Sequence, residues 1–322
     1  MKIIKSVGKL LAVCLVVIAL LLAGLHIGVT AMYWDYFSHA DAAFRVPGLQ
    51  DGFVPQGFAY VEEGDYYLAS GYMQDHTASR VYVRDSQGRV RWVELKNGDG
   101  SDYSAHAGGI AVNGRFAYLP GESGIDVFYL SDLLEQEQAK CIGTIPMEYE
   151  GDCCTFYDGY LFVGDFYRPE VYETPQDHHV TTPVGDRNPA VIAVYRADEA
   201  AEFGLELHPV AAISVREQVQ GIGITQDGEI VLSTSYGFAS SHLWFYSWDE
   251  ARQGTLELDG REVPLYYLDS ANLTHSVELP PMSEEVVCWD GKVYVLMESA
   301  CTKYKFGNLI RGTQVFAYEK PE

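Results

Sequence analysis

The chain has 322 residues, of which 45 are Asp or Glu and 22 are Lys or Arg, giving a formal net charge of −23. This charge excludes nucleic acid as a partner, because a phosphate backbone would approach a surface of its own sign. Hydrophobic residues make up 48% of the chain and aromatic residues 13%, which is enough for a packed core and excludes wholesale disorder. The 23 Tyr and 31 Gly favour sheet and turns over a helical bundle.

The N-terminal segment predicts insertion into a membrane. An apolar run from Leu10 to Trp34 holds no formal charge and follows three lysines. About 20 apolar residues span the hydrocarbon layer, and lysines before the run hold the N-terminus in the cytoplasm. We therefore expect a cytoplasmic tail at 1–9 and a transmembrane signal anchor at 10–34.

The rest of the chain is then exported. The expected product is a single-pass cell-membrane protein whose C-terminal domain is extracytoplasmic. The alternative is secretion after cleavage near Val29-Thr30-Ala31, a passable small-residue site. Five cysteines lie in the exported part, and their odd number and strand-like neighbours favour buried, unpaired thiols over a complete disulfide framework.

A fivefold repeat organises the exported part. Each unit holds two short apolar strands joined by a tight turn, and the turns are built on Glu-Gly-Asp, Asn-Gly or Asp-Gly, which are strong hairpin signals. The five hairpins cover 55–72, 107–123, 151–167, 219–237 and 283–299. A third strand follows every hairpin and a fourth follows all but the last. Tandem four-stranded units predict an all-β domain, a five-bladed β-propeller over 43–322.

The fifth unit contains only three strands. We expect the segment 43–49 to supply its missing strand, because an N-terminal strand that completes the last blade closes the ring and removes an open edge. The residues 35–42 would then form a spacer between anchor and disc. Six blades are the alternative, since the intervals between the third, fourth and fifth hairpins are long.

The first blade resembles the opening of plant-type glutaminyl cyclases, which are five-bladed propellers. The resemblance rests on Gln56-Gly57-Phe58 and on SGYMQDHTASRVYVRD after the first hairpin. Other exported propellers share the Gln-Gly-hydrophobic start, which recurs here at Gln220-Gly221-Ile222. The glutaminyl cyclase family has a catalytic Glu opening its second blade, where this chain has Gly108. The resemblance therefore implies the architecture and not that activity.

Blade geometry predicts a functional face. Inner strands start on the face that also carries the long loops 73–79, 97–107, 166–189 and 300–312, and binding residues usually lie on such loops. The strand starts would bring Gln56, His106, Asp152, Gln220, Glu284 and Glu285 to the channel mouth. The ends of the second strands would add Tyr72, Glu122, Asp165, Tyr167, Tyr236 and Glu298.

Three interpretations of this mouth stay open. Carboxylate and amide oxygens are the ligands that Ca²⁺ prefers, so a calcium site is one. Acid–base catalysis by Glu285, Asp152 and His106 is another, because crowded carboxylates raise one another's pKa. The third is a water-filled channel whose polar groups are satisfied by solvent.

The function expected from these features is binding of a small polar ligand, a glycan or a peptide at the loop-rich channel face. Aromatic side chains at the mouth would stack on sugar rings or grip peptide side chains. One alternative is a hydrolase, lyase or cyclotransferase that uses the channel-mouth carboxylates and His106. Another is a structural component of an envelope complex. No phosphate-binding loop, zinc-peptidase motif or α/β-hydrolase nucleophile motif is present to favour those chemistries.

Overall fold

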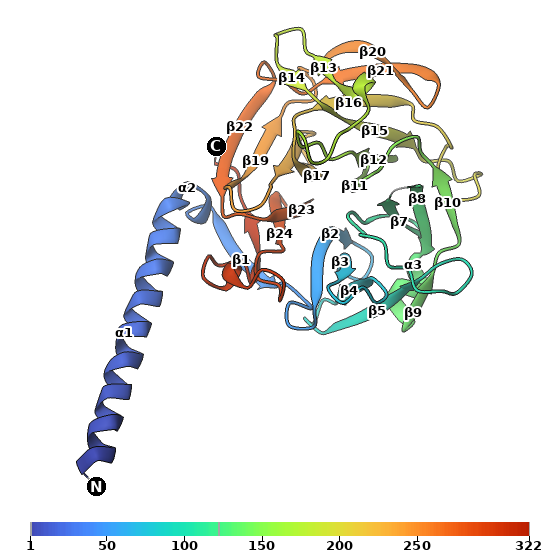
Figure 1. Cartoon of the computed structure of the whole chain (residues 1–322). Helices are drawn as coiled ribbons and strands as arrows, with labels where there is room; N and C mark the ends of the chain where they lie inside the picture. The colour runs from blue at the N-terminus through green and yellow to red at the C-terminus, as the bar shows by residue number, and fades with distance from the viewer. Residues whose placement is uncertain (1, 122, 322) are drawn as a thin grey trace.

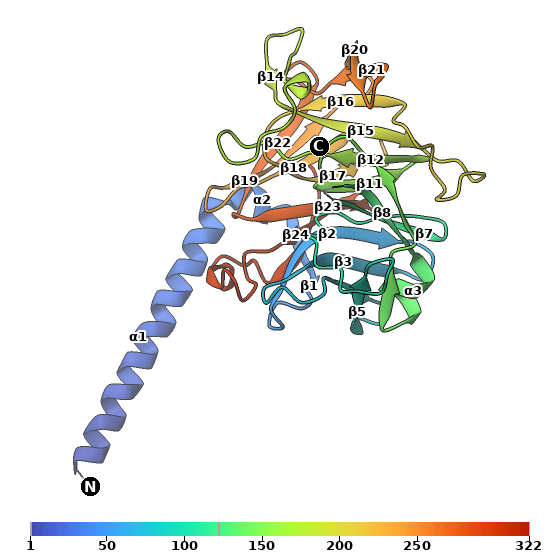
Figure 2. The same cartoon turned by 45° about the vertical axis from the view of Figure 1, so that its right-hand side comes forward.

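Five sheets form a ring after one long N-terminal helix in the computed structural model, which describes residues 2–121 and 123–321, without the side chains of 2–8, 10 and 11 (Figures 1 and 2). Helix α1 covers Lys2–Met32, and the single turn α2 covers Trp34–Phe37. Within α1, the 21 residues Ala12–Met32 have a mean hydropathy of 2.7, which is long and apolar enough to cross a membrane.

Each blade is an antiparallel sheet of four strands, and its innermost strand comes first in the sequence of the unit. The exception is the last blade, whose outermost strand is β1 (Ala40–Arg45), the first strand of the chain. Blade 1 holds β2 (Phe53–Val61), β3 (Tyr66–Met73), β4 (Arg80–Arg84) and β5 (Val90–Lys96). Blade 2 holds β6 (Ala111–Asn113), β7 (Phe116–Gly121), β8 (Gly124–Tyr129) and β10 (Gly143–Pro146). Blade 3 holds β11 (Cys153–Tyr157), β12 (Tyr160–Gly164), β15 (Ala190–Arg196) and β16 (Ala211–Val215). Blade 4 holds β17 (Val219–Ile224), β18 (Ile230–Thr234), β19 (Ser241–Tyr246) and β22 (Leu273–Leu279).

The inner hairpins lie where the turn residues predict them. In the turn between β11 and β12, both central residues have positive φ, 47° at Asp158 and 80° at Gly159. This is the backbone of a type I′ turn, whose twist matches that of the flanking strands. The predicted five-bladed architecture is thereby confirmed, one blade for each hairpin.

Blade 5 closes the ring with a strand from the front of the domain. It holds β23 (Ser283–Trp289), β24 (Lys292–Met297) and β25 (Gln314–Tyr318), and its outer strand is β1 (Ala40–Arg45). β1 pairs antiparallel with β25, from Ala40 opposite Tyr318 to Arg45 opposite Gln314. An N-terminal strand closes the ring as predicted, but it covers 40–45 instead of 43–49: it begins three residues earlier, inside the expected spacer, and ends four residues earlier. The strand begins earlier than predicted because Ala40 and Asp41 also pair with β25, up to its last residue.

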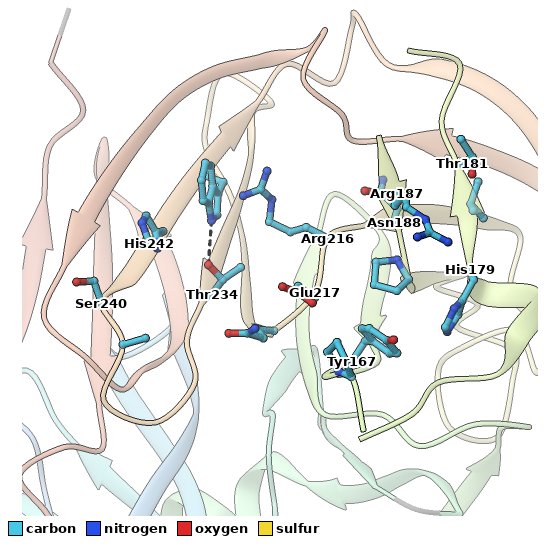
Figure 3. Close-up of a pocket in the computed structure, with 16 residues that line it drawn as sticks. Tyr167, His179, Thr181, Arg187, Asn188, Arg216, Glu217, Thr234, Ser240 and His242 are labelled. Atoms are coloured by element: carbon cyan, nitrogen blue, oxygen red, sulfur yellow. Dashed lines mark hydrogen bonds between the residues drawn. The ribbon is translucent and has the colours of Figure 1, made fainter. Parts of the chain in front are cut away.

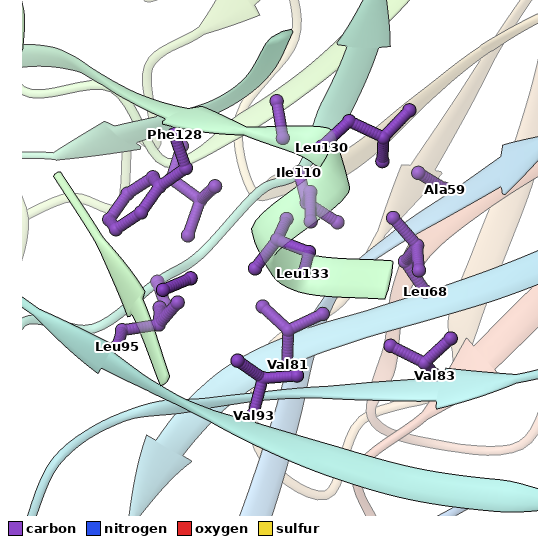
Figure 4. Close-up of a cluster of buried hydrophobic side chains, with 14 of the residues drawn as sticks. Ala59, Leu68, Val81, Val83, Val93, Leu95, Ile110, Phe128, Leu130 and Leu133 are labelled. Atoms are coloured by element: carbon purple, nitrogen blue, oxygen red, sulfur yellow. The ribbon is translucent and has the colours of Figure 1, made fainter. Parts of the chain in front are cut away.

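The core consists of hydrophobic clusters at the junctions between blades. Along an inner strand, successive side chains enter different junctions, because side chains alternate across a strand. Cys153 packs toward blade 4, and Cys154 packs toward blade 2. Figure 4 shows the junction of blades 1 and 2, where Val81 and Val93 meet Ile110 and Phe128. All six cysteines are free, and those at 141, 153, 154 and 301 are buried.

Two insertions account for the long intervals that allowed a sixth blade. The hairpin of β20 (Arg252–Leu258) and β21 (Arg261–Tyr267) leaves blade 4 and extends blade 3, because β21 pairs in parallel with β16. The other interval holds η1 (Gln176–His178), β13 (Val180–Thr181) and β14 (Arg187–Asn188). Smaller additions are α3 (Leu130–Glu135), β9 (Gln138–Lys140) beside β5, and η2 (Phe306–Asn308).

The end of α1 packs against the disc. Val29 and Tyr33 are buried in the cluster that joins blades 4 and 5, and the Tyr33 hydroxyl lies 3.2 Å from the Ser240 hydroxyl. Tyr36, in α2, is 1% exposed and stacks on Tyr318 with ring centroids 5.4 Å apart. The helix therefore leaves the disc from its rim beside blades 4 and 5, as Figure 1 shows.

Candidate functional site

A cavity of about 750 Å³ opens at the mouth of the central channel, and we call it the axial cavity. Every blade contributes to it near the start of its inner strand, through Gln56, His106, Asp152, Gln220 and Glu284. The ends of the second strands add Tyr72, Asp165, Tyr236 and Glu298. The structure therefore brings together all the predicted site residues except Glu122, Tyr167 and Glu285.

β-Bulges orient three of these side chains. The register shifts between Pro55 and Gly57 in β2, between Val219 and Gly221 in β17, and between Ser283 and Val286 in β23. These shifts fall on Gln56, on Gln220, and on Glu284 with Glu285. A bulge places an extra residue in the strand and redirects its side chain, so the same local irregularity serves three blades.

Glu285, predicted as a catalytic residue, does not line the axial cavity. Its side chain is fully buried, and its carboxylate accepts backbone N–H groups from Cys154 at 3.0 Å, Ile222 at 2.6 Å and Val286 at 3.2 Å. These contacts tie blade 5 to blades 3 and 4. The bulge explains this placement, because it turns Glu284 toward the cavity and Glu285 into the blade junctions.

The other two exceptions have different causes. Tyr167 follows Phe166 in the long loop and lines a neighbouring cavity instead of the axial one. Glu122 lies outside the described residues.

Glu284 and Glu298 form a proton-sharing pair in the cavity wall. Burial first, and then the charge and hydrogen bond of Glu298, raise the pKa of Glu284 well above its ordinary value. Burial raises the pKa of Glu298 to about 7, against the opposing effects of Lys303, Gln56 and Glu284. The pair therefore keeps a proton to higher pH than free carboxyl groups do, as expected for two interacting carboxyl groups in a buried site.

A hydrogen-bond chain leads from this pair to His106. The Gln56 amide donates from Nε2 to Glu298 Oε2 at 3.1 Å, and its oxygen faces His106 Nε2 within hydrogen-bond distance. Desolvation, with a further effect of Lys303, lowers the pKa of His106 to about 4. The imidazole is then neutral at pH 7 and donates from Nε2 to Gln56, so its Nδ1 is an acceptor.

Two aspartates occupy the blade 3 side of the cavity. Burial, with the charges of Glu150 and Asp165, raises the pKa of Asp152 to about 8, although its carboxylate accepts the Phe166 N–H at 3.0 Å. Asp165 is buried against His178, with Oδ2 and Nδ1 2.5 Å apart, and also accepts the Val191 N–H at 2.7 Å. Burial raises the pKa of Asp165, and His178 opposes that rise.

Lys303 also lines the cavity, although no sequence pattern predicted it. Its ammonium donates to the Tyr72 hydroxyl at 2.5 Å and lies 4.9 Å from the centre of the Tyr304 ring. Burial opposes its charge, but hydrogen bonds to the two tyrosines outweigh burial and keep the Lys303 pKa above its ordinary value. The available signal was the loop 300–312, already predicted to lie on the functional face.

Aromatic rings line the remaining wall. The Phe166 ring lies 5.5 Å from Tyr172 and 6.4 Å from Tyr236, measured between ring centres. The Arg168 guanidinium lies 3.6 Å from the centre of the Tyr236 ring and fixes its orientation. The cavity thus combines an apolar wall with acid, amide, imidazole and ammonium groups.

Among the described residues, no cluster of three or more His, Cys, Asp or Glu side chains is arranged to hold a metal ion, and the calcium interpretation stays one of the three. At the start of blade 2, a Cβ on Gly108 would lie 2.4 Å from the carbonyl oxygen of Asp152. No side chain fits there, so the carboxylate that the resembling family carries at this place has no room here.

No protein-family model and no curated protein matches the chain. Among solved structures, an oxidoreductase (glucose dehydrogenase) from Thermus thermophilus is 14% identical, with a TM-score of 0.46 over 86% of this chain and 98% of that chain. The PQQ-bound aldose sugar dehydrogenase of Streptomyces coelicolor is 17% identical, with a TM-score of 0.44 over 80% and 78%. Myxococcus xanthus glutaminyl cyclase is 11% identical, with a TM-score of 0.42 over 80% and 90%. At these identities and TM-scores the likeness does not extend to activity.

Proposed function

We propose that this protein binds a small polar ligand, a glycan or a short peptide, in the axial cavity. The observation that carries the proposal is the convergence of proton-bearing carboxyls, Gln56, Lys303 and an aromatic wall in about 750 Å³. Small-molecule sites have this size and this combination of apolar walls with a few polar groups.

The charges favour a neutral or cationic ligand. Carboxyl groups lining the cavity come from Glu150, Asp152, Asp165, Glu173, Glu284 and Glu298, whereas Lys303 is the one lysine or arginine among its described lining residues. A polyanion would meet this acidic wall unfavourably. Ligand hydroxyl and amide groups suit this cavity, because the protonated carboxyl and Lys303 donate hydrogen bonds and the carboxylate oxygens accept them.

The test is thermal unfolding of the full chain in detergent or nanodiscs with neutral oligosaccharides and short peptides. A ligand at 100 times its dissociation constant stabilises the native state by about 2.7 kcal/mol. We expect Glu298→Gln and Glu284→Gln to reduce that shift, because they change the proton-sharing pair. The matched control is Glu262→Gln on the exposed face of β21. No ligand-dependent shift across the panel, or equal shifts in all variants, would contradict the proposal.

Acid–base catalysis at the same cavity is the second candidate. It is favoured by the raised pKa values of Asp152, Glu284 and Glu298, because perturbed carboxyls concentrate in active sites. In this second candidate function, protonated Asp152 acts as the general acid near neutral pH. Turnover of glycosides and N-terminal-Gln peptides would then follow a bell-shaped pH profile, and Asp152→Asn would remove one limb of that profile. Binding without turnover of any panel member identifies a binding protein.

We also propose that α1 is retained as a membrane anchor and that the propeller is extracytoplasmic. The helix continues through 29–31, and Val29 and Tyr33 pack against the disc, which favours an uncleaved segment. Membrane fractionation, intact mass and protease accessibility in spheroplasts test this. A mature N-terminus near Met32 in the soluble fraction would show secretion instead.

A further inference from the structure

A second cavity, of about 730 Å³, opens beside the axial cavity, and we call it the lateral cavity (Figure 3). The loop 166–189 forms a wall of both cavities. The lateral cavity is otherwise bounded by the segment 216–218 just before β17, by the end of β18, by the loop residues 239–240 and by β19. Its groups play no part in the function proposed above.

The lateral cavity carries positive charge. Arg187 comes from β14, and Arg216 precedes β17. Glu217 is the one carboxylate among the described residues that line this cavity, and neither arginine forms an ion pair within the described part of the chain. Hydrogen bonds from Ser270 and the charge of Arg216 lower the pKa of Asp186, but Asp186 Oδ2 accepts the Ser270 N–H and forms no ion pair with Arg216.

Arg216 is held in place by its aromatic neighbours. Its guanidinium carbon lies 3.5 Å from the centre of the Trp244 ring, and its Nε donates to the Tyr246 hydroxyl at 2.9 Å. Trp244 is itself fixed, because its Nε1 donates to Thr234 Oγ1 at 2.9 Å and His242 stacks on it at 5.1 Å. The terminal nitrogens of Arg216 have no hydrogen bond among the described residues, so they remain available to a ligand.

We propose that the lateral cavity binds the phosphate group of a larger molecule. A preorganised guanidinium with free terminal N–H groups suits phosphate, because its fork donates two parallel hydrogen bonds to two oxygens. Arg187 supplies a second positive charge to the same anion. The volume exceeds that of a phosphate ion, so the phosphate is one end of the ligand and the polar loop 166–189 contacts the rest.

A membrane lipid and a soluble phosphate ester both offer this chemistry. The lipid source is geometrically accessible, because Ser240 lines the cavity and its hydroxyl lies 3.2 Å from that of Tyr33, the residue after α1. The cavity is therefore next to the end of the helix that would cross the bilayer. The experiment needs one arm for each source.

The full chain is first titrated in neutral detergent with inorganic phosphate, following thermal unfolding. In parallel, nanodiscs of phosphatidylcholine alone are compared with nanodiscs in which phosphatidylglycerol is about one lipid in five, following amide exchange at 234–246 and 187–190. A phosphate-dependent shift that weakens with salt, or added protection with the anionic lipid, supports the proposal and identifies the source. Neither response in either arm would overturn it.

Substitutions assign the response to this cavity. Arg216→Gln and Arg187→Gln should each weaken phosphate binding about tenfold or more, since each loses charged hydrogen bonds. Arg216→Lys should recover part of the affinity, because it keeps the charge without the fork. Arg187 is exposed, so its variant will fold even if Arg216→Gln destabilises the Trp244 contact. Arg261→Gln, at the exposed start of β21, is the control. Equal affinities in all four variants and the wild type would also overturn the proposal.

Discussion

Glu285 Oε2 accepts the backbone N–H of Cys154 at 3.0 Å, although the two residues are 131 positions apart in the chain. The other oxygen accepts the N–H of Ile222 at 2.6 Å. One side chain therefore joins the inner strands of blades 3, 4 and 5. Buried backbone N–H groups need acceptors. The Glu285 carboxylate accepts N–H groups of inner strands in neighbouring blades, which do not pair with each other.

We predict that Glu285→Gln destabilises the propeller without a specific effect on ligand binding. An amide keeps one acceptor oxygen but turns an NH₂ group toward a backbone donor, so a buried N–H loses its partner. The expected loss is about 1–3 kcal/mol in the free energy of unfolding, measured by chemical denaturation. Glu284→Gln is the matched comparison, because it is the preceding residue and lines the cavity. A stable Glu285→Gln variant with impaired binding would return Glu285 to the site.

The sequence predicted the blades because their signals are local. An Asp-Gly pair favours positive φ within its own turn: both residues adopt it at Asp158-Gly159, and the glycine adopts it at Asp227-Gly228. Closure of the ring could also be predicted, because the fifth unit has three strands where each of the others has four. Both ends of β1 needed the structure.

The separation of Glu284 from Glu285 could not be predicted in this way. Strand alternation says that neighbours face opposite sides, but it does not say which one faces the cavity, and the bulge between Ser283 and Val286 disturbs the alternation. Lys303 depends on how the loop 300–312 folds back over the mouth, which is a tertiary outcome. The same holds for β21, which joins the sheet of another blade.

We predict that the propeller loses stability as pH rises through neutrality. Asp152 has a folded pKa of about 8 against 3.8 for the free group, and Glu298 about 7 against 4.5. Because folding raises these values, the stability they contribute is complete below the unfolded pKa values and is lost as pH rises toward 7 and 8. The expected loss is about 1–3 kcal/mol between about pH 5 and about pH 8.5, reduced from the full linkage value because water enters the cavity.

Asp152→Asn tests the origin of this loss. The amide oxygen can still accept the Phe166 N–H, but the group no longer titrates. Thermal unfolding of the variant should therefore depend less on pH than that of the wild type. Asp158→Asn, in the exposed turn of the same blade, should leave the pH dependence unchanged, and Asn tolerates the positive φ there. If both variants follow the wild-type curve, Asp152 does not carry the effect.

We predict that the cysteines of the propeller react slowly in the native state. Burial raises the pKa of the thiols of Cys153 and Cys154 well above the ordinary value and that of Cys288 to about 12, and the thiolate is the reactive form. Alkylation followed by mass spectrometry should modify these cysteines only after unfolding, without any reductant. Gln87→Cys, in an exposed turn, provides the fast-reacting control. A disulfide-linked peptide from the unreduced chain would contradict the prediction.

We predict that the Asp165–His178 contact holds the loop 166–189 over both cavities. The two side chains are each 4% exposed and lie 2.5 Å apart, so removing either partner leaves a buried polar group unpaired. His178→Ala should destabilise the loop by about 1–3 kcal/mol, the cost typical of leaving a buried hydrogen-bonding group unpaired, and should increase amide exchange and proteolysis at 168–187. Asp177→Asn changes an exposed neighbour in the same turn and should alter neither measurement. Because the loop lines both cavities, His178→Ala should also weaken binding in each, whereas unchanged exchange in this variant would show that the loop is held by other contacts.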